Sequence, residues 1–144
     1  MTKEQIFEFM TKAGFFHLAT IEDGKPRVRA IMLYSAGKEG IIFHTGTFKD
    51  LYKQLEGCKD AELCFNDLQN NIQVRAFGKL DEITDTLKKD EIINHPSRQF
   101  LQGWKNSMSI DEFYKSFKVY TLRNGSAAVW TMATNNAPKT VIKL

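Results

Sequence analysis

The sequence predicts a mainly β protein in which short helices accompany antiparallel strands. Six or seven short segments have the alternation or the β-branched and aromatic content of strands, and most are joined by turns rather than crossover helices. An open sheet would leave backbone groups unpaired at its edges, so we expect closure into a barrel. A length of 144 residues is typical of one domain, and we expect a single domain over residues 1–144.

The chain begins with a pattern typical of a helix followed by a hairpin. Thr2 and Gln5 form a capping-box pattern at the start of a helix that should end near Gly14. Residues 15–35 are rich in apolar side chains around a turn at residues 22–25, which predicts two paired strands.

A second unit is expected to run from a strand into a helix through a polar turn. Residues 40–45 predict the third strand, and residues 48–56 predict a helix. Thr47 would be the N-cap of this helix and Gly57 its C-cap residue. Residues 61–66 then predict the fourth strand.

The second half of the chain contains the clearest strand and the strongest hairpin signal. Residues 72–80 alternate, so that one face is apolar and the other carries mostly polar groups. Residues 84–117 have a helical pattern that is broken at Pro96. Within residues 118–130, the Asn-Gly pair at 124–125 suits a type I′ turn between two strands.

The second predicted strand carries bulky apolar residues on both faces. Val28 and Met32 share one face, and Ile31 and Leu33 share the other. A face in contact with water would not carry such side chains. We therefore expect one face to fill the barrel and the other to pack against something else, such as a partner subunit.

Composition argues against several classes of function. The net charge of +3 is too small to indicate nucleic-acid binding. No apolar run approaches the roughly 20 residues that cross a bilayer, and the first residues lack the order of a signal peptide. We therefore expect a cytoplasmic protein with neither a membrane nor a nucleic acid as its partner.

The common catalytic and metal-binding motifs are missing from the sequence. The three histidines have no metal-ligand spacing, and the chain contains no HExxH, CxxC, GxSxG, GxGxxG or Walker-type pattern. The spacing of Cys58 and Cys64 indicates neither a disulfide framework nor a metal site. Nucleophilic catalysis and a bound metal are therefore not expected.

The polar turn before the second predicted helix is a candidate anion site. Thr45, Thr47 and Lys49 lie where the first N–H groups of a helix attract negative charge. Arg29 interrupts an otherwise apolar strand and is a candidate for the same site. Ordinary capping by Thr47, with Lys49 in solvent, explains the local pattern at least as well, so the residues alone leave both interpretations open.

Four segments, in order along the chain, resemble the pyridoxamine 5′-phosphate oxidase-like family of FMN-binding split barrels. Residues 15–34 contain the LAT…G.P..R pattern of its opening strands, and FHTGTFK at 43–49 resembles its strand–turn–helix phosphate segment. Residues 72–80 are similar to its QVRVxG strand, and AAVW at 127–130 to its late tryptophan strand. The resemblance implies a six-stranded antiparallel Greek-key barrel that forms a homodimer, with FMN in clefts between the subunits.

The resemblance also implies an FMN contact for each matching residue. Arg29 and Lys49 would bind the phosphate, where each charge-assisted hydrogen bond is worth about 1.5–3 kcal/mol. The other implied contacts are Ala30, Ile31, Met32 and Tyr34 beside the flavin, His44 and Thr45 at the ring or ribityl chain, Gln73 at the pyrimidine edge, and Trp130 from the second subunit.

Three departures from the family pattern remove one expected FMN phosphate contact and argue against a vitamin-B6 substrate. Tyr34 stands where the true oxidases have a lysine, and Phe48 stands where they have the arginine of an arginine–lysine pair. Residues 131–140 contain no counterpart of their RLH-type stretch. The compact outline is more similar to the small general-stress-protein branch. Tyr34 and His44 are candidate acid or base groups by proximity alone.

The leading interpretation is therefore an FMN-dependent oxidoreductase that acts on an unidentified small molecule. The alternatives are a non-catalytic flavin- or haem-binding stress-response protein, a true pyridoxamine 5′-phosphate oxidase, and a deazaflavin-dependent reductase. The last should need a larger basic surface than Arg27, Arg29 and Lys49 offer. Because Arg27 and Arg29 share a strand face, the sequence leaves open which of them faces the site.

Overall fold

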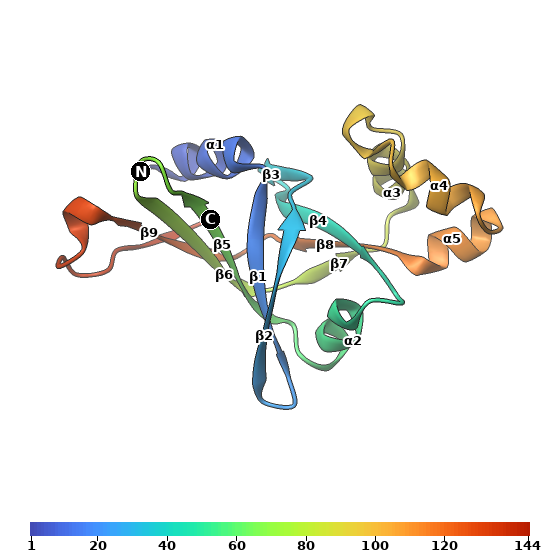
Figure 1. Ribbon diagram of the computed structural model, residues 1–144, viewed down its shortest axis with the longest axis horizontal. Coiled ribbons are helices and arrows are strands. Elements are labelled where there is room, and N and C mark those ends of the chain that lie inside the picture. The colour runs from blue at the N-terminus through green and yellow to red at the C-terminus, as the bar shows by residue number, and fades with distance from the viewer.

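Two antiparallel sheets form the centre of the computed structural model, which describes residues 1–144 (Figure 1). The six-stranded sheet has the order β10-β9-β6-β5-β1-β2, and the four-stranded sheet has the order β3-β4-β8-β7. The prediction of a mainly β protein with antiparallel strands and short helices is confirmed. No helix is long and apolar enough to cross a bilayer.

The secondary structure contains more strands than the sequence predicts, because three short ones at 35–37, 81–83 and 141–143 were missed. The strands are β1 Phe15–Glu22, β2 Lys25–Met32, β3 Ser35–Gly37, β4 Gly40–Gly46, β5 Asp60–Asp67, β6 Ile72–Lys79, β7 Asp81–Ile83, β8 Phe117–Leu122, β9 Ser126–Thr131 and β10 Val141–Lys143. The helices are α1 Lys3–Ala13, α2 Asp50–Gly57, α3 Thr86–Ile93, α4 Leu101–Asn106 and α5 Ile110–Ser116, with 3₁₀ turns η1 Pro96–Arg98 and η2 Met132–Thr134.

Helix α1 has the predicted ends and packs against β3 of the four-stranded sheet and β5 of the six-stranded sheet. The Thr2 hydroxyl accepts a hydrogen bond from the backbone N–H of Gln5, and the Gln5 side chain accepts one from the backbone N–H of Thr2. Gly14 ends the helix with a left-handed φ of 74°. Ile6 and Met10, one turn apart, are fully buried, so this side of the helix faces the core.

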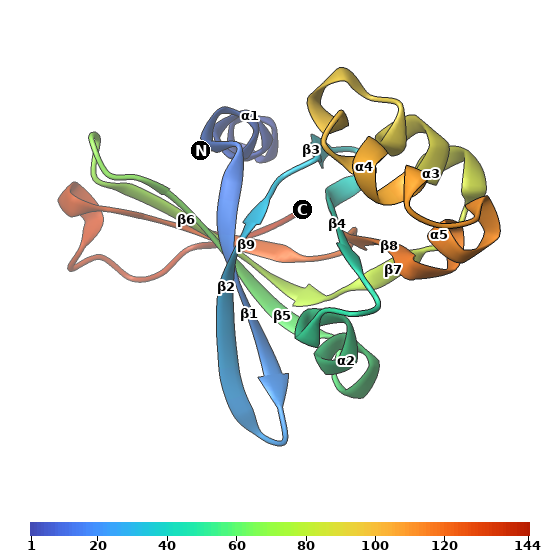
Figure 2. The ribbon, with the colours of Figure 1, turned by 45° about the vertical axis from the view of Figure 1, so that its right-hand side comes forward.

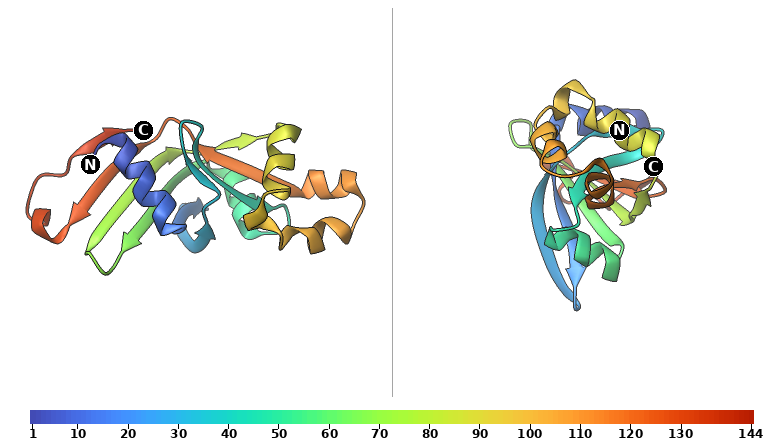
Figure 3. Two further views of the ribbon diagram at one scale, coloured as in Figure 1. Left: turned by 90° about the horizontal axis from the view of Figure 1, so that it is seen from above. Right: turned by 90° about the vertical axis from the view of Figure 1, so that its right-hand side faces the viewer.

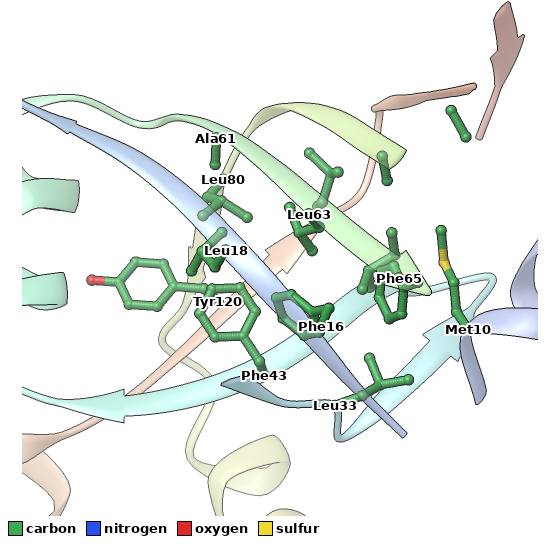
Figure 4. Packing of buried hydrophobic residues seen from close by; sticks show 14 of the residues in the cluster. Met10, Phe16, Leu18, Leu33, Phe43, Ala61, Leu63, Phe65, Leu80 and Tyr120 are labelled. Atoms are coloured by element: carbon green, nitrogen blue, oxygen red, sulfur yellow. The ribbon is translucent and has the colours of Figure 1, made fainter. Parts of the chain in front are cut away.

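The main core lies between the two sheets and contains a chain of aromatic rings (Figure 4). Phe16 contacts Phe43 at 5.6 Å and Phe65 at 5.0 Å between ring centroids, and Phe43 stacks on Tyr120 at 5.9 Å. The three phenylalanines are fully buried, and Tyr120 is almost so. Such pairs contribute about 0.5–1.5 kcal/mol each beyond the burial of their area.

Helices α3 to α5 form a second, smaller core against the four-stranded sheet, at one end of the long axis of the molecule (Figure 3). Phe113 of α5 and Phe117 of β8 stack at 5.4 Å, and Trp104 of α4 contacts Phe113 edge-on at 5.0 Å. The predicted helical region with a break at Pro96 is confirmed, because η1 begins at that residue. This helical unit supplies one wall of the cavity described below.

The hairpin predicted at residues 118–130 is wrong. Strand β8 pairs with β4 and β7 in the smaller sheet, whereas β9 pairs with β6 and β10 in the larger one. The segment between Leu122 and Ser126 therefore carries the chain from one sheet to the other. Gly125 is required there for close packing, because a Cβ on it would lie 2.8 Å from Cγ of Leu122 and 3.0 Å from the carbonyl oxygen of Phe77.

Candidate functional site

A cavity of about 820 Å³ is lined by residues of β2, the end of β4, the start of α2 and the helix α4. Figure 2 shows how these four elements are arranged. Strand β2 reaches it as one arm of the β1–β2 hairpin, and α2 follows β4 after a short turn. Six of the ten residues that the resemblance assigns to FMN line this cavity: Arg29, Ala30, Ile31, His44, Thr45 and Lys49.

The guanidinium of Arg29 is held in one orientation by neutral groups. Its Nη1 donates to the hydroxyl of Thr20 at 2.6 Å and to the carbonyl oxygen of Leu18 at 3.2 Å. Its Nη2 donates to the side-chain oxygen of Gln54, which also accepts a hydrogen bond from Thr20 at 2.7 Å. Because Thr20 and Gln54 are both buried, β1 and α2 fix the arginine that enters from β2.

The charge of Arg29 has no carboxylate partner within ion-pair distance, although Arg27 on the same strand face has one. Arg27 Nε lies 2.9 Å from Oε2 of Glu22, whereas none of the six ion pairs in the protein involves Arg29. Burial lowers the pKa of Arg29, against the opposing effect of nearby Asp50 and Glu22. Both arginines line the cavity, but Arg29 is the one whose charge is left for a ligand.

Helix α2 begins later than predicted, and no side chain caps the N–H groups of its first turn. The helix begins at Asp50 with Lys49 as the N-cap residue. Thr47, the predicted N-cap, lies in the preceding turn, where its backbone N–H donates to the carbonyl oxygen of Ser116 at 3.0 Å. The predicted C-cap Gly57 is instead the last helical residue, before Cys58. An uncapped helix start beside Arg29 and Lys49 favours an anion, while Asp50 contributes one carboxylate to the same turn.

His44 also lines the cavity and contacts a buried arginine that the sequence did not single out. Arg98 Nε donates to Nε2 of His44 at 2.9 Å, and Arg98 Nη2 donates to the carbonyl oxygen of Leu33 at 2.6 Å. Burial, together with the neighbouring guanidinium, lowers the pKa of His44 to about 4. Burial also lowers the pKa of Arg98, whose side chain is 3% exposed.

Aromatic side chains complete the cavity on the side of the helical unit. Phe48 is 63% exposed and meets Trp104 edge-on at 5.2 Å, and Phe100 lies on the same wall. Gly46 allows this approach, because a Cβ there would lie 2.5 Å from Cε1 of Phe48 and 3.0 Å from Cη2 of Trp104. Trp104, Phe100 and Gln54 were not predicted as site residues, since their helical segments carry no local motif.

The four remaining predicted site residues do not line this cavity within one copy of the chain. Met32 is on the outer face of β2, and Tyr34 donates a hydrogen bond to Glu91 at 2.8 Å. Burial, with that hydrogen bond, raises the pKa of Tyr34 to about 12. Gln73 and Trp130 are cross-strand partners on β6 and β9 of the larger sheet.

The family model described as pyridoxamine 5′-phosphate oxidase matches residues 2–119. The chain belongs to this family. The match confirms the family membership inferred from the four quoted segments.

Curated oxidases of the pyridoxamine 5′-phosphate oxidase family match part of the chain. A pyridoxine/pyridoxamine 5′-phosphate oxidase from Brucella anthropi is 26% identical over 93 residues, which are 64% of this chain and 46% of that protein. One from Rhizobium johnstonii is 35% identical over 69 residues, which are 47% of this chain and 34% of that protein. The matched segments thus span less than half the length of these relatives.

Solved structures of the family show the same fold. A NimC/NimA family protein from Clostridium acetobutylicum superimposes with a TM-score of 0.73 at 19% identity, covering 99% of this chain and 93% of that one. General Stress Protein 26 from Bacillus anthracis gives 0.70 at 13%, covering 99% and 98%. A pyridoxamine 5′-phosphate oxidase-related, FMN-binding protein from Nostoc punctiforme gives 0.62 at 15%, covering 98% and 95%. General Stress Protein 26, the kind of relative that the sequence suggested, is thus among the structures that share the fold.

Proposed function

We propose that the protein binds FMN in the cavity beside Arg29 and acts as an FMN-dependent oxidoreductase on a small molecule. The observation that carries this proposal is a fixed guanidinium without a carboxylate partner, next to an uncapped helix start and Lys49. The family and the Nostoc relative, which is described as FMN-binding, support the choice of cofactor.

The residues of the cavity fit the parts of FMN. Its phosphate would lie between Arg29, Lys49 and the first N–H groups of α2, where charge-assisted hydrogen bonds replace water. The flavin ring would lie along Ala30 and Ile31, in a cavity whose 820 Å³ is within the usual range for small-molecule sites, about 300–1,000 Å³. Bound FMN would supply the electron transfer. The chain binds and orients the group and limits its contact with water.

The homodimer belongs to the same proposal because β1 and β2 present an apolar outer face. Phe15 opposes Met32 across the two strands, and Ala19 opposes Val28. Phe15, Met32 and Val28 are 55%, 52% and 69% exposed, and β2 is the edge strand of its sheet. An exposed apolar patch of this kind is typical of an interface between subunits. Gln73 and Trp130, which do not line the cavity in one chain, would then complete the site from the second subunit.

The test of the cofactor site compares FMN with riboflavin, which lacks the phosphate. The purified protein should be yellow or take up added FMN. Arg29→Ala and Lys49→Ala should each weaken FMN binding about tenfold or more, with a smaller effect on riboflavin, measured by fluorescence titration. A colourless protein that takes up no FMN would overturn the proposal.

A matched variant controls for general loss of positive charge. Lys53→Ala removes an exposed lysine one turn further along α2, which does not line the cavity. It should bind FMN within about threefold of the unchanged protein, because its charge is not available to the phosphate. If Arg29→Ala lost equal affinity for FMN and for riboflavin, the phosphate would lie elsewhere.

A further inference from the structure

His44 presents a single hydrogen-bond donor to the cavity. It lies in β4 and lines the cavity, with its ring 5.3 Å from Phe117 and 6.2 Å from Phe100. Nε2 accepts the hydrogen bond from Arg98, while Nδ1 has no partner in the protein. The hydroxyl of Tyr120 is the one buried side-chain polar atom without a hydrogen-bond partner. Nδ1 of His44 also has no partner, so it is not a buried atom and is open to the cavity that His44 lines.

Arg98 determines which nitrogen of His44 carries the proton. Arginine has only donors, so Nε2 of a neutral His44 must be the acceptor and Nδ1 must carry the hydrogen. Arg98 is itself fixed, because it also donates to the carbonyl oxygen of Leu33 and to the hydroxyl of Ser97 at 3.0 Å. Water in the place of Arg98 could either donate or accept, and it would leave both tautomers accessible.

The charge of Arg98 also affects what His44 can bind. No carboxylate pairs with this guanidinium, which instead lies over the rings of Tyr34 at 5.5 Å and Phe100 at 6.0 Å. A buried positive charge next to His44 polarises the Nδ1–H bond and disfavours a cationic ligand. An oxygen acceptor, charged or neutral, is the group that matches this donor.

The aromatic side chains beside this donor favour a planar ligand. Phe48, Phe100 and Trp104 offer aromatic surfaces to the cavity, and Phe48 and Phe100 are more than half exposed. Rings of this kind stack on or contact planar ligands edge-on. The combination of one polarised donor with an aromatic wall differs from the cationic chemistry around Arg29, which lines the same cavity.

We propose that Arg98 holds His44 in the Nδ1–H tautomer, and that His44 donates this hydrogen bond to an oxygen acceptor on a planar aromatic substrate. Arg98 is thus a positioning residue, and His44 contacts the ligand. The substrate part of this inference rests on the proposed FMN function, because it places the substrate beside the flavin. The tautomer and the binding of a planar acceptor are testable without FMN.

The first experiment measures the tautomer by ¹⁵N NMR of the histidine rings in the FMN-free protein near pH 7. His44 should be protonated at Nδ1 in the unchanged protein and in Arg98→Lys, which keeps a donor. Arg98→Met should convert a large fraction to the Nε2–H form. A purely structural role of Arg98 would leave the tautomer unchanged. An Nε2–H signal in the unchanged protein, or no shift in Arg98→Met, would overturn the assignment.

The second experiment uses benzoate as a planar probe and cyclohexanecarboxylate as its non-planar counterpart of equal charge. Binding is followed by ligand-observed NMR, with and without FMN. Benzoate should bind several-fold more tightly than cyclohexanecarboxylate, and His44→Phe should weaken benzoate about tenfold. The control is Lys105→Ala, which removes a cation next to Trp104 that does not line the cavity; it should bind benzoate as the unchanged protein does.

Two results would contradict the substrate class. One is equal binding of the planar and the non-planar carboxylate, and the other is unchanged benzoate binding in His44→Phe. The absorption spectrum in the same titration reports whether FMN is bound. A failure of the flavin proposal is therefore visible separately, while benzoate binding to the FMN-free protein still tests the donor and the aromatic wall.

Discussion

At the scale of single residues, His44 should make stability depend on pH. Its pKa falls to about 4, mainly through burial and next through Arg98, the charged side chain that faces it. An unfolded histidine has a pKa of about 6.5, so the unfolded chain binds more protons between these values. His44 therefore contributes fully above pH 6.5. Its contribution decreases as the pH falls toward 4, by at most about 1.4 kcal/mol per pH unit.

Urea unfolding at pH 7, 6 and 5 measures this effect for the unchanged protein and for His44→Gln. The glutamine oxygen can accept the hydrogen bond of Arg98 but does not titrate. The unchanged protein should therefore lose stability more steeply than the variant as the pH falls. Parallel losses in the two proteins would show that His44 is not responsible.

Individual residues also differ in whether local sequence can identify them as part of the site. Arg29, Thr45 and Lys49 were found because each lies on a strand or at the strand-to-helix turn that carries the family pattern, and the cavity brings them together. Arg98 and Trp104 were not found, because they come from a helical region more than 50 residues away in sequence from His44 and Gly46. Only the packing of α3 to α5 on the four-stranded sheet brings them to the cavity.

At the scale of elements, the passage from β8 to β9 makes a prediction about Gly125. Replacing it by alanine places a Cβ 2.8 Å from Cγ of the buried Leu122 and 3.0 Å from the carbonyl oxygen of Phe77, where the backbone cannot yield cheaply. Gly125→Ala should lower the free energy of unfolding by about 1–3 kcal/mol, measured by urea denaturation.

Gly103 in α4 provides the matched control. A Cβ there would meet nothing within 4 Å, and alanine is the better helix former. Gly103→Ala should leave stability unchanged or raise it by up to about 1 kcal/mol. An equal effect of the two substitutions would contradict the tight crossing between the sheets.

The ends of helices and strands were predicted correctly where local hydrogen bonds determine them. Helix α1 has a capping box and a terminal glycine within its own residues, so local hydrogen bonds decide both of its ends. The Asn-Gly pair at 124–125 carries an equally clear local signal, yet tertiary pairing overrides it. Strand β8 finds two partners in the smaller sheet, and a hairpin with β9 would forfeit one of them.

At the scale of the whole molecule, strand β2 has a different role on each of its faces. The pattern of apolar residues on both faces predicted this, and the structure shows Leu33, just after the strand, buried while Val28 and Met32 point outward. The face of Arg29 lines the cavity, and so do Val28 and Ala30 of the other face, whereas Met32 lies beyond it at the edge of the larger sheet. Sequence alone predicts apolar residues on that outer face but does not identify what packs on it, because a contact between two chains leaves no pattern of spacing within one of them.

Phe15→Glu tests whether this outer face joins two copies of the chain. Phe15 is 55% exposed, lies opposite Met32 and does not line the cavity. A glutamate there should weaken the dimer at least tenfold, because an unpaired charge would have to be buried in each subunit. Analytical ultracentrifugation should find a dimer for the unchanged protein and for Leu68→Glu, whose leucine is 84% exposed in the turn after β5. If Trp130 and Gln73 act from the second subunit, FMN binding should fall together with dimerisation. A Phe15→Glu protein that stays dimeric would place the interface elsewhere.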